Sequence, residues 1–525
     1  MKKALTCFIV SFIAFAHGIN AQVWSSVGQY GISGGLSSYN SIAIDGSGSV
    51  YIAYRDHSNS DMATVMKYNG TSWTTVGSAG FSSVAVTYTN IAISGSGIPY
   101  VAFSDGANGN KATVMKYNGS SWVTVGSADF SAAGVYYTTI AIDASGTPYV
   151  AYHDLSLGIV AMEYNGSSWV EVGGTVVAST GDYPTLVLDG SGNPYVVYSD
   201  NNVAQKTTVK KYNGTAWATV GSAGFSAAAA YYTSIALGSG STPYVVYQDV
   251  ANSNKATVMK YNGSSWAAVG SVGFSAGGTQ YNSIAVNSSG TPYVIYQDQA
   301  SGSGSGATVM SYNGSSWVDV GPVNFSMGSA AYTALAINAG GIPYTVCENV
   351  GNGYKATVMS FGPIDAITGT YTVCPGYTTT LSNLSIGGSW SSSNVGVATV
   401  DSYNGLVSGI AAGTTSISYT QSGSTAVQIV TVNSCTTELK NITTQAASSL
   451  TLFPNPTHNT FTLHLTTQTN EPATITITNI LGEKVKQLTT STNTDTQIQL
   501  DSPPGIYFIS ATTKQGSVNE KIMLE

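Results

Sequence analysis

One tryptophan-led phrase recurs seven times along the first part of this 525-residue chain. In its fifth copy the tryptophan opens W-A-T-V-G, and Y-T-S-I-A-L, P-Y-V-V-Y-Q-D and A-T-V-M-K-Y-N-G follow in that order. These segments are short, β-branched or aromatic, and bounded by turn-forming residues, which is typical of strands. The seven tryptophans lie 47 to 51 residues apart, at Trp24, Trp73, Trp122, Trp169, Trp217, Trp266 and Trp317. A four-strand unit of this period predicts a β-propeller blade and not a helical repeat.

The order of strands within a blade follows from the turns. Six copies carry an Asn-Gly pair between the third segment and the next tryptophan, which predicts a type I′ hairpin there, as at Asn69-Gly70, Asn118-Gly119, Asn213-Gly214 and Asn262-Gly263. The Y-T-S-I-A-L segment is then innermost and the tryptophan strand outermost. The seventh copy ends at Phe361 without a tryptophan strand, whereas Trp24 to Gly28 form one without a preceding partner. We expect these two ends to pair, closing residues 22–361 into a seven-bladed propeller.

The N-terminal residues and the net charge indicate the export of the chain and the kinds of partner it can have. Lys2 and Lys3 precede an apolar stretch from Ala4 to Ala16, and small residues run to Ala21, so residues 1–21 are predicted to be a secretory signal peptide. No later stretch reaches the roughly 18 apolar residues of a membrane helix, so we expect no transmembrane segment. The net charge is −8 and charged residues are only 8%. Without a basic stripe, nucleic acid is an unexpected partner.

Cysteine usage leaves one pairing open. Cys7 leaves with the signal peptide, and Cys347 replaces a strand tyrosine in the last repeat, where we expect a buried thiol. Cys374 and Cys435 bracket a later domain. Export permits a disulfide between them, and the sequence leaves paired and unpaired states equally open.

The repeat and the segment after it resemble known families. The phrase from Asp143 to Tyr152 resembles kelch, NHL and other propeller repeats, without matching one closely enough to imply a function. Residues 366–435 resemble a bacterial Ig-like domain of group 2, through Trp390 to Asp401 and Asn404 to Tyr419. The resemblance implies a small β-sandwich that acts as a spacer or adhesion element, with Trp390 in its core. The polar residues 436–449 are predicted to be a linker.

The last segment, residues 450–525, resembles the type A sorting domain of the type IX secretion system. The matching motifs are Leu452 to Thr457, Ile477 to Val485, Pro504 to Ile509 and the terminal K-I-M-L-E. The resemblance implies another β-sandwich, recognised by the type IX secretion machinery of a Bacteroidetes-type bacterium. It also implies that the protein is secreted or attached to the outer cell surface. The chain as a whole is therefore predicted to be all-β, with a propeller, an Ig-like sandwich and a sorting domain.

Two rings of residues recur near the propeller face that carries the long loops. Tyr39, Tyr88, Tyr137, Tyr183, Tyr232, Tyr281 and Tyr332 begin the inner strands. Asp56, Asp105, Asp154, Asp200, Asp249 and Asp298 end the second strands, with Asn349 in the seventh copy. Because every blade keeps them, we interpret both rings as structural: Tyr packs between sheets, and Asp accepts backbone N–H bonds as the chain turns.

A binding site is better sought where the blades differ. The position before the Asp reads Arg55, Ser104, His153, Ser199, Gln248, Gln297 and Glu348. Polar variety beside aromatic rings suits the reading of a glycan or peptide. The candidate ligand-binding residues are therefore Arg55, His153, Gln248, Gln297 and Glu348, with Tyr137 and Tyr232.

Function is predicted from these features and from missing motifs. The sequence has no H-E-x-x-H, G-x-S-x-G or phosphate-binding loop, and we assign no catalytic residue, metal or cofactor. We expect a secreted or surface binding or adhesion protein whose loop face binds a glycan or an extracellular protein. The alternative is a secreted carbohydrate-active hydrolase with two carboxylates on that face.

Overall fold

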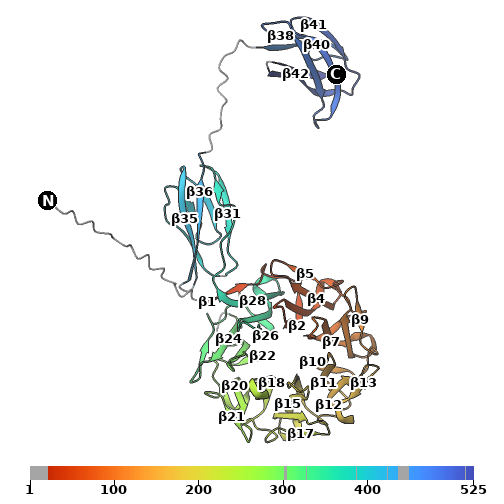
Figure 1. Cartoon of the computed structure of the whole chain (residues 1–525), viewed down its shortest axis with the longest axis vertical. Helices are drawn as coiled ribbons and strands as arrows, with labels where there is room; N and C mark the ends of the chain where they lie inside the picture. The colour runs from red at the N-terminus through yellow and green to blue at the C-terminus, as the bar shows by residue number, and fades with distance from the viewer. Residues whose placement is uncertain are drawn as a thin grey trace, which may run out of the picture. The chain divides into compact units, whose positions relative to one another are not determined.

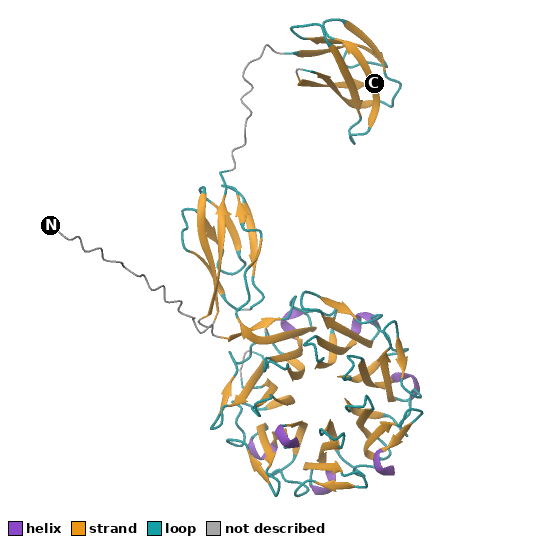
Figure 2. Ribbon diagram, in the orientation of Figure 1, coloured by secondary structure: helices purple, strands orange, loops and turns teal. Residues whose placement is uncertain are grey.

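The computed structural model describes residues 22–300, 304–326, 328–385, 387–421, 424–434, 448–514 and 516–525. The predicted signal peptide lies outside the described residues, and so does most of the predicted linker. By its contacts the chain forms two compact units, Met1–Ser434 and Cys435–Glu525. Strands dominate the described residues, and the predicted all-β fold is confirmed (Figure 2).

Seven four-stranded antiparallel sheets form a ring along residues 22–363 (Figure 1). The first strand of each sheet contacts the first strands of both neighbours, so these strands are innermost. Blades 1 to 3 consist of β2 (Ser37–Ile44), β3 (Val50–Asp56), β4 (Met62–Tyr68) and β5 (Trp73–Thr75); β6 (Val86–Ile93), β7 (Pro99–Asp105), β8 (Lys111–Tyr117) and β9 (Trp122–Thr124); and β10 (Val135–Ile142), β11 (Pro148–Asp154), β12 (Gly158–Tyr164) and β13 (Trp169–Glu171).

Blades 4 to 6 repeat the same order. They consist of β14 (Asp182–Leu188), β15 (Pro194–Asp200), β16 (Lys206–Tyr212) and β17 (Trp217–Thr219); β18 (Ala230–Leu237), β19 (Pro243–Asp249), β20 (Lys255–Tyr261) and β21 (Trp266–Ala268); and β22 (Thr279–Val286), β23 (Pro292–Asp298), β24 (Ala307–Tyr312) and β25 (Trp317–Asp319). Short 3₁₀ turns interrupt the loops at His57–Asn59, Gly106–Asn108, Val172–Gly174, Asn201–Val203, Ser239–Ser241, Val250–Asn252 and Val350–Asn352.

Blade 7 joins the two ends of the propeller sequence. It contains β26 (Ala330–Ile337), β27 (Pro343–Asn349) and β28 (Lys355–Pro363), and its outermost strand is β1 (Gln22–Ser26). β1 pairs with β28 in antiparallel register, with Trp24 opposite Phe361. The predicted closure of the ring is confirmed.

The recurring tryptophan holds neighbouring blades together at the rim. The Nε1 of each recurring tryptophan donates to the carbonyl of the valine that directly follows the preceding outermost strand, three residues after that strand's own tryptophan. The bonds are Trp73 to Val27 (2.6 Å), Trp122 to Val76 (2.7 Å), Trp169 to Val125 (2.8 Å), Trp217 to Val172 (3.0 Å), Trp266 to Val220 (2.7 Å), Trp317 to Val269 (2.7 Å) and Trp24 to Val320 (2.6 Å). These bonds form a closed outer belt, which explains why each blade needs the phrase W-x-x-V-G.

The glycine that ends this phrase is required by geometry. Gly77 has φ +71°, a left-handed conformation, and a Cβ there would lie 3.0 Å from Tyr117 Cε2 and 3.1 Å from Trp122 Cδ1. Only glycine adopts this backbone without cost and lets the next blade's rings approach so closely.

The predicted turn type between the third and fourth strands is wrong, although the hairpin itself is present. Tyr68 pairs with Trp73, so four residues make the connection. The Asn69 Oδ1 accepts the backbone N–H groups of Thr71 and Ser72, both at 2.9 Å. The Asn side chain therefore satisfies the turn's amides, and Gly70 alone takes a positive φ, of 94°.

A β-sandwich follows the propeller in the same unit. Its sheets have the orders β29-β31-β34-β33 and β30-β36-β35-β32, and Trp390 is a core residue, as predicted (6% exposed). The strands are β29 (Thr368–Gly369), β30 (Thr372–Val373), β31 (Thr378–Ser382), β32 (Ser389–Ser392), β33 (Ala398–Val400), β34 (Leu406–Gly409), β35 (Gly413–Gln421) and β36 (Ser424–Val432). Its membership of the Ig-like group stays a prediction. So does the disulfide of Cys374, because Cys435 lies outside the described residues.

The second unit is another two-sheet β-sandwich. Its sheets have the orders β37-β38-β41 and β40-β39-β42-β43, around a core that includes Phe461, Ile475 and Ile509. The strands are β37 (Ser449–Phe453), β38 (Thr460–Thr466), β39 (Pro472–Thr478), β40 (Lys484–Ser491), β41 (Asp495–Gln499), β42 (Gly505–Thr513) and β43 (Gly516–Leu524).

Candidate functional site

The seven recurring tyrosines form a closed collar around the axis of the propeller. A register shift near the start of each innermost strand places its tyrosine at φ 49° to 56°. Each ring contacts the tyrosine of both neighbouring blades, with centroids 4.6–5.4 Å apart. The expected packing between adjacent blades is confirmed. Left-handed φ is costly for a bulky residue, so the surrounding structure must hold it in place.

Hydroxyl groups one residue further along supply part of that support. The Thr89 Oγ1 donates to the carbonyl of Tyr39 at 2.5 Å, and Thr233 and Thr333 donate to the tyrosine carbonyl of their preceding blades in the same way. These bonds form an inner counterpart to the tryptophan belt. Burial raises the pKa of Tyr137, and it raises the pKa of Tyr232 to about 12, so both phenols stay neutral.

The aspartates that end the second strands are also structural. The Asp56 Oδ1 accepts the backbone N–H of Ser58 at 3.0 Å, and its Oδ2 accepts the Thr64 hydroxyl at 2.9 Å. Asp200 and Asp249 repeat both kinds of bond, to a backbone N–H two residues on and to a threonine of the third strand. The predicted role of these aspartates in the turns is confirmed.

Two of the candidate ligand-binding residues on this loop face are tied to carboxylates. The Arg55 Nη2 lies 2.6 Å from Asp61 Oδ2, and His57 Nδ1 lies 2.6 Å from the other oxygen. The hydrogen bond from Arg55 lowers the pKa of Asp61. In blade 3, His153 Nδ1 lies 3.0 Å from Asp182 Oδ1, and this contact lowers the pKa of Asp182. Arg55 and His153 therefore already have carboxylate partners within the protein.

The other three candidates differ in their exposure and in the hydrogen bonds that they already make within the protein. Gln248 is buried and donates to the carbonyl of Thr279, and Gln297 is buried beside the Ser329 hydroxyl at 3.5 Å. Glu348 is partly exposed, and burial raises its pKa to about 7. Among the described residues, no hydrogen bond or ion pair joins any two of the five polar candidates. Their role in binding stays a prediction.

The larger cavities lie on the opposite face, between successive blades. Three of them are lined by a second-strand tyrosine of one blade and by two tight turns, one of them the Asn-Gly turn of the next blade, whereas the fourth, between blades 6 and 7, has no Asn-Gly turn. We name each groove by its two blades. The volumes are about 650 Å³ for groove 4/5, 430 Å³ for groove 5/6, 460 Å³ for groove 2/3 and 210 Å³ for groove 6/7. The expectation that long loops carry the site overlooked these grooves.

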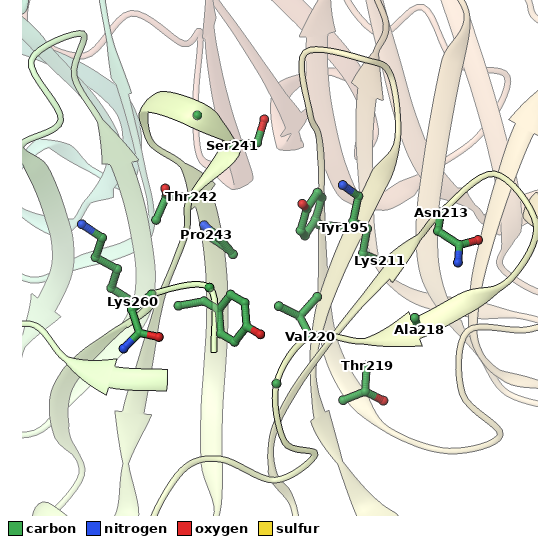
Figure 3. A pocket seen from close by; sticks show the side chains of 15 residues that line it. Tyr195, Lys211, Asn213, Ala218, Thr219, Val220, Ser241, Thr242, Pro243 and Lys260 are labelled. Carbon is green, nitrogen blue, oxygen red and sulfur yellow. The ribbon is translucent and has the colours of Figure 1, made fainter. Parts of the chain in front are cut away.

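Groove 4/5 shows the arrangement most fully (Figure 3). Tyr195 and Lys211 stand on the blade 4 side, and the Thr242–Pro243 turn stands on the blade 5 side. Lys260, Tyr261 and the Asn262-Gly263 turn also line it. No aspartate or glutamate is among the residues that line this groove. It therefore offers aromatic surface, ammonium groups, hydroxyls and amides to a ligand.

A lysine covers the second-strand tyrosine in four of the blades. The Nζ atoms of Lys67, Lys116, Lys211 and Lys260 lie 4.9, 5.8, 4.8 and 5.1 Å from the ring centroids of Tyr51, Tyr100, Tyr195 and Tyr244. The two residues face each other on paired strands, as Tyr244 and Lys260 do. The signal was present in the sequence, since four of the chain's 17 basic residues occupy one position of the repeat.

A family model matches the C-terminal segment only. Residues 451–525 match the secretion system C-terminal sorting domain, which confirms the resemblance of this segment to a sorting domain. The protein is secreted or attached to the outer cell surface. In the described part of the chain, no helix has the length and apolar character needed to cross a membrane.

Solved structures with a similar fold are lectins and enzymes. The SapL1 lectin in complex with α-methyl fucoside is 18% identical, covers 57% of this chain and 99% of its own, and has a TM-score of 0.37. A mutant Aleuria aurantia lectin bound to Fucα1-6GlcNAc is 17% identical; the match covers 55% of this chain and 95% of the lectin, with a TM-score of 0.38. A fungal alcohol oxidase in complex with copper is 10% identical; the match covers 78% of this chain and 100% of the oxidase, with a TM-score of 0.42. The likeness concerns the fold alone. A search of curated proteins found no match.

Proposed function

We propose that this exported protein binds glycans in the grooves between its blades. The observation that carries the proposal is groove 4/5, whose volume of about 650 Å³ falls in the range of about 300–1,000 Å³ typical of small-ligand sites. Its aromatic wall offers apolar surface to the C–H face of a sugar ring, and its amides and hydroxyls offer hydrogen bonds to sugar hydroxyls. An extracellular protein partner would instead need a broad surface with a buried apolar centre.

Repetition adds to the case for a polymeric ligand. Grooves 2/3, 4/5 and 5/6 share the same tyrosine and the same turns, so one molecule presents several similar sites on one face. A polysaccharide that engages two sites binds more tightly than one site alone, because the second contact is intramolecular. A repeated groove of modest affinity is therefore sufficient for adhesion to a glycan-coated surface.

The hydrolase alternative is less well supported. A glycosidase of the usual kind needs two carboxyl groups facing one site, about 5–10 Å apart. None of the grooves described above is lined by two carboxylates. On the loop face, Asp61 and Asp182 are ion-paired with lowered pKa values, and neither suits a proton donor. Glu348 has the raised pKa of a general acid but lacks a partner carboxylate in its own blade.

The test is a glycan array on the purified full chain, followed by calorimetry with a soluble oligosaccharide from the strongest hits. Thr219→Trp blocks groove 4/5, because Thr219 lines that groove and is exposed. Ala251→Trp is the matched control, since Ala251 is exposed on the loop face. We expect T219W to lower the number of bound oligosaccharides by one and A251W to leave it unchanged. Loss of binding in A251W alone would move the site to the loop face and refute the proposal.

A further inference from the structure

We propose that two unpaired lysines that line grooves, Lys116 and Lys260, bind the acidic groups of a polysaccharide, a uronate carboxylate or a sulfate ester. This inference rests on the proposed glycan-binding function and names its substrate class. It follows from one position of the third strand, next to the tyrosine that ends it, which differs from blade to blade. In order from blade 1 this position holds Lys67, Lys116, Glu163, Lys211, Lys260, Ser311 and Ser360.

Two of the four lysines are neutralised by their own blade. The Lys67 Nζ lies 3.8 Å from Asp45 Oδ2, and the Lys211 Nζ lies 2.9 Å from Asp189 Oδ2. Both aspartates are the first residue of the turn between the first and second strands. Burial alone would raise the pKa of Asp189, but bonds from Lys211 and from backbone amides outweigh it and lower that pKa. Lys67 and Lys211 are therefore each balanced by a carboxylate, although the unpaired Lys260 also lines groove 4/5.

The other two lysines lack such a partner. Ser94 occupies the aspartate's place in blade 2 and Gly238 occupies it in blade 5. Among the described residues, no salt bridge is formed by Lys116 or Lys260. Their ammonium groups, partly buried over Tyr100 and Tyr244, remain uncompensated. A partly buried cation beside a low-dielectric ring attracts an anion more strongly than a fully hydrated one does.

The surroundings of these lysines favour an anion of modest size. Groove 5/6 has a volume of about 430 Å³, and Ser289, Thr291 and Asn313 in its lining supply hydrogen-bond donors. No carboxylate lines it. Groove 2/3 has a similar volume of about 460 Å³. Glu163 also lines groove 2/3, and its carboxylate interacts with Tyr149, another lining residue, so groove 5/6 is the more cationic of the two.

The ring is therefore patterned by charge. Blade 3 carries Glu163 in place of the lysine, with Asp143 in the turn of the same blade. Blades 6 and 7 carry serine at this position, and Asp319 lines groove 6/7. Lys116 and Lys260 are three blades apart. A single acidic chain that reaches both would gain from their combined affinity, whereas a neutral chain would not discriminate among grooves.

The experiment compares dextran with dextran sulfate, and adds oligogalacturonate to distinguish carboxylate from sulfate. The full chain and two double variants are immobilised at equal density, and binding is measured at low and at physiological salt. Lys116→Gln with Lys260→Gln removes the unpaired charges. Lys67→Gln with Lys211→Gln is the matched control, because it removes the same net charge from lysines that already have a partner. Circular dichroism melting confirms that both variants fold.

We expect the natural chain to bind at least one acidic polymer at least tenfold more tightly than dextran, and to weaken as salt increases. K116Q/K260Q should lose at least tenfold of that affinity, whereas K67Q/K211Q should lose less than threefold. An equal loss in both variants would refute the assignment to the unpaired lysines. Binding of dextran equal to that of the acidic polymers would refute the acidic class while leaving glycan binding intact. Failure to bind any glycan on the array would remove the proposed function itself.

Discussion

Closure of the propeller depends on Trp24, because the N-terminal strand β1 is joined to blade 7 without a connecting hairpin. The Trp24 side chain is 1% exposed, stacks on Phe325 with centroids 4.3 Å apart, and donates to the Val320 carbonyl at 2.6 Å. Trp24→Phe keeps an aromatic ring but leaves that carbonyl without its donor. An unpaired buried acceptor costs about 1–3 kcal/mol, and the smaller ring also leaves a void. We expect a loss of about 3 kcal/mol.

Trp122→Phe is the matched control for this substitution. Trp122 makes the same bond, to Val76 at 2.7 Å, and the same stacking, on Phe81 at 4.1 Å. Its strand is joined to the preceding strand of its own blade by a hairpin, and Trp122 is only partly buried. Water can therefore replace the lost donor, and we expect a loss of stability of about 1 kcal/mol. Hydrogen exchange followed by mass spectrometry reports the difference locally. W24F should speed exchange in residues 22–26 and 355–363, whereas W122F should leave those residues protected. Equal protection of both segments in the two variants would refute the closure argument.

Three further substitutions or probes test other parts of the propeller. Burial raises the pKa of Glu348 from its usual 4.5 to about 7 in the folded state. The folded state therefore binds a proton more tightly than the unfolded state, and the natural chain loses stability as pH rises through that interval. Glu348→Gln should raise the melting temperature at pH 8 and change it little at pH 4. Cys347 is 2% exposed and burial raises its pKa to about 12, so an alkylating reagent should modify it only after denaturation, as mass spectrometry would show. Gly77→Ala should cost about 2–4 kcal/mol in a denaturant titration, through its left-handed φ and its contacts with Tyr117 and Trp122. Gly214→Ala, at φ +94° in open space, should cost about 1 kcal/mol, and an equal loss at both glycines would contradict the packing argument.

The sequence predicted the architecture well because the architecture is repeated seven times. The tryptophan spacing, the four short segments and the unpaired Trp24 strand were sufficient to predict blades, strand order and closure. The buried Cys347 and Trp390 also followed, since each occupies an apolar position in a strand. The turn at Asn69 was wrong in type because the dipeptide preference ignores the Asn side chain, which accepts two backbone amides here.

The candidate site was harder to predict because it depends on contacts between residues far apart in sequence. Arg55 and His153 were selected for their variety, but each already contacts a carboxylate, of Asp61 and of Asp182, and those contacts depend on how the loops fold. Groove 4/5 is lined by segments that begin at Tyr195 and end at Gly263, from two successive blades. Neither blade alone contains the groove, so no local motif could indicate it.

Within the repeat, the residues that hold neighbouring blades together differ from those that line the grooves, so one ring can hold several different sites. Contacts between blades use the indole nitrogen of the tryptophan, the valine carbonyl, the glycine after it and the tyrosine collar. The third-strand position of Lys260 takes no part in either belt, and its side chain extends over Tyr244 at the edge of a groove. Replacing that lysine with Glu163 or Ser311, as the chain itself does in other blades, changes the charge of a groove without altering the belts. A heteropolymer with acidic and neutral residues would therefore meet grooves of one shape but different charge. The position of the acidic groups along the polymer would then decide which grooves it can occupy at once.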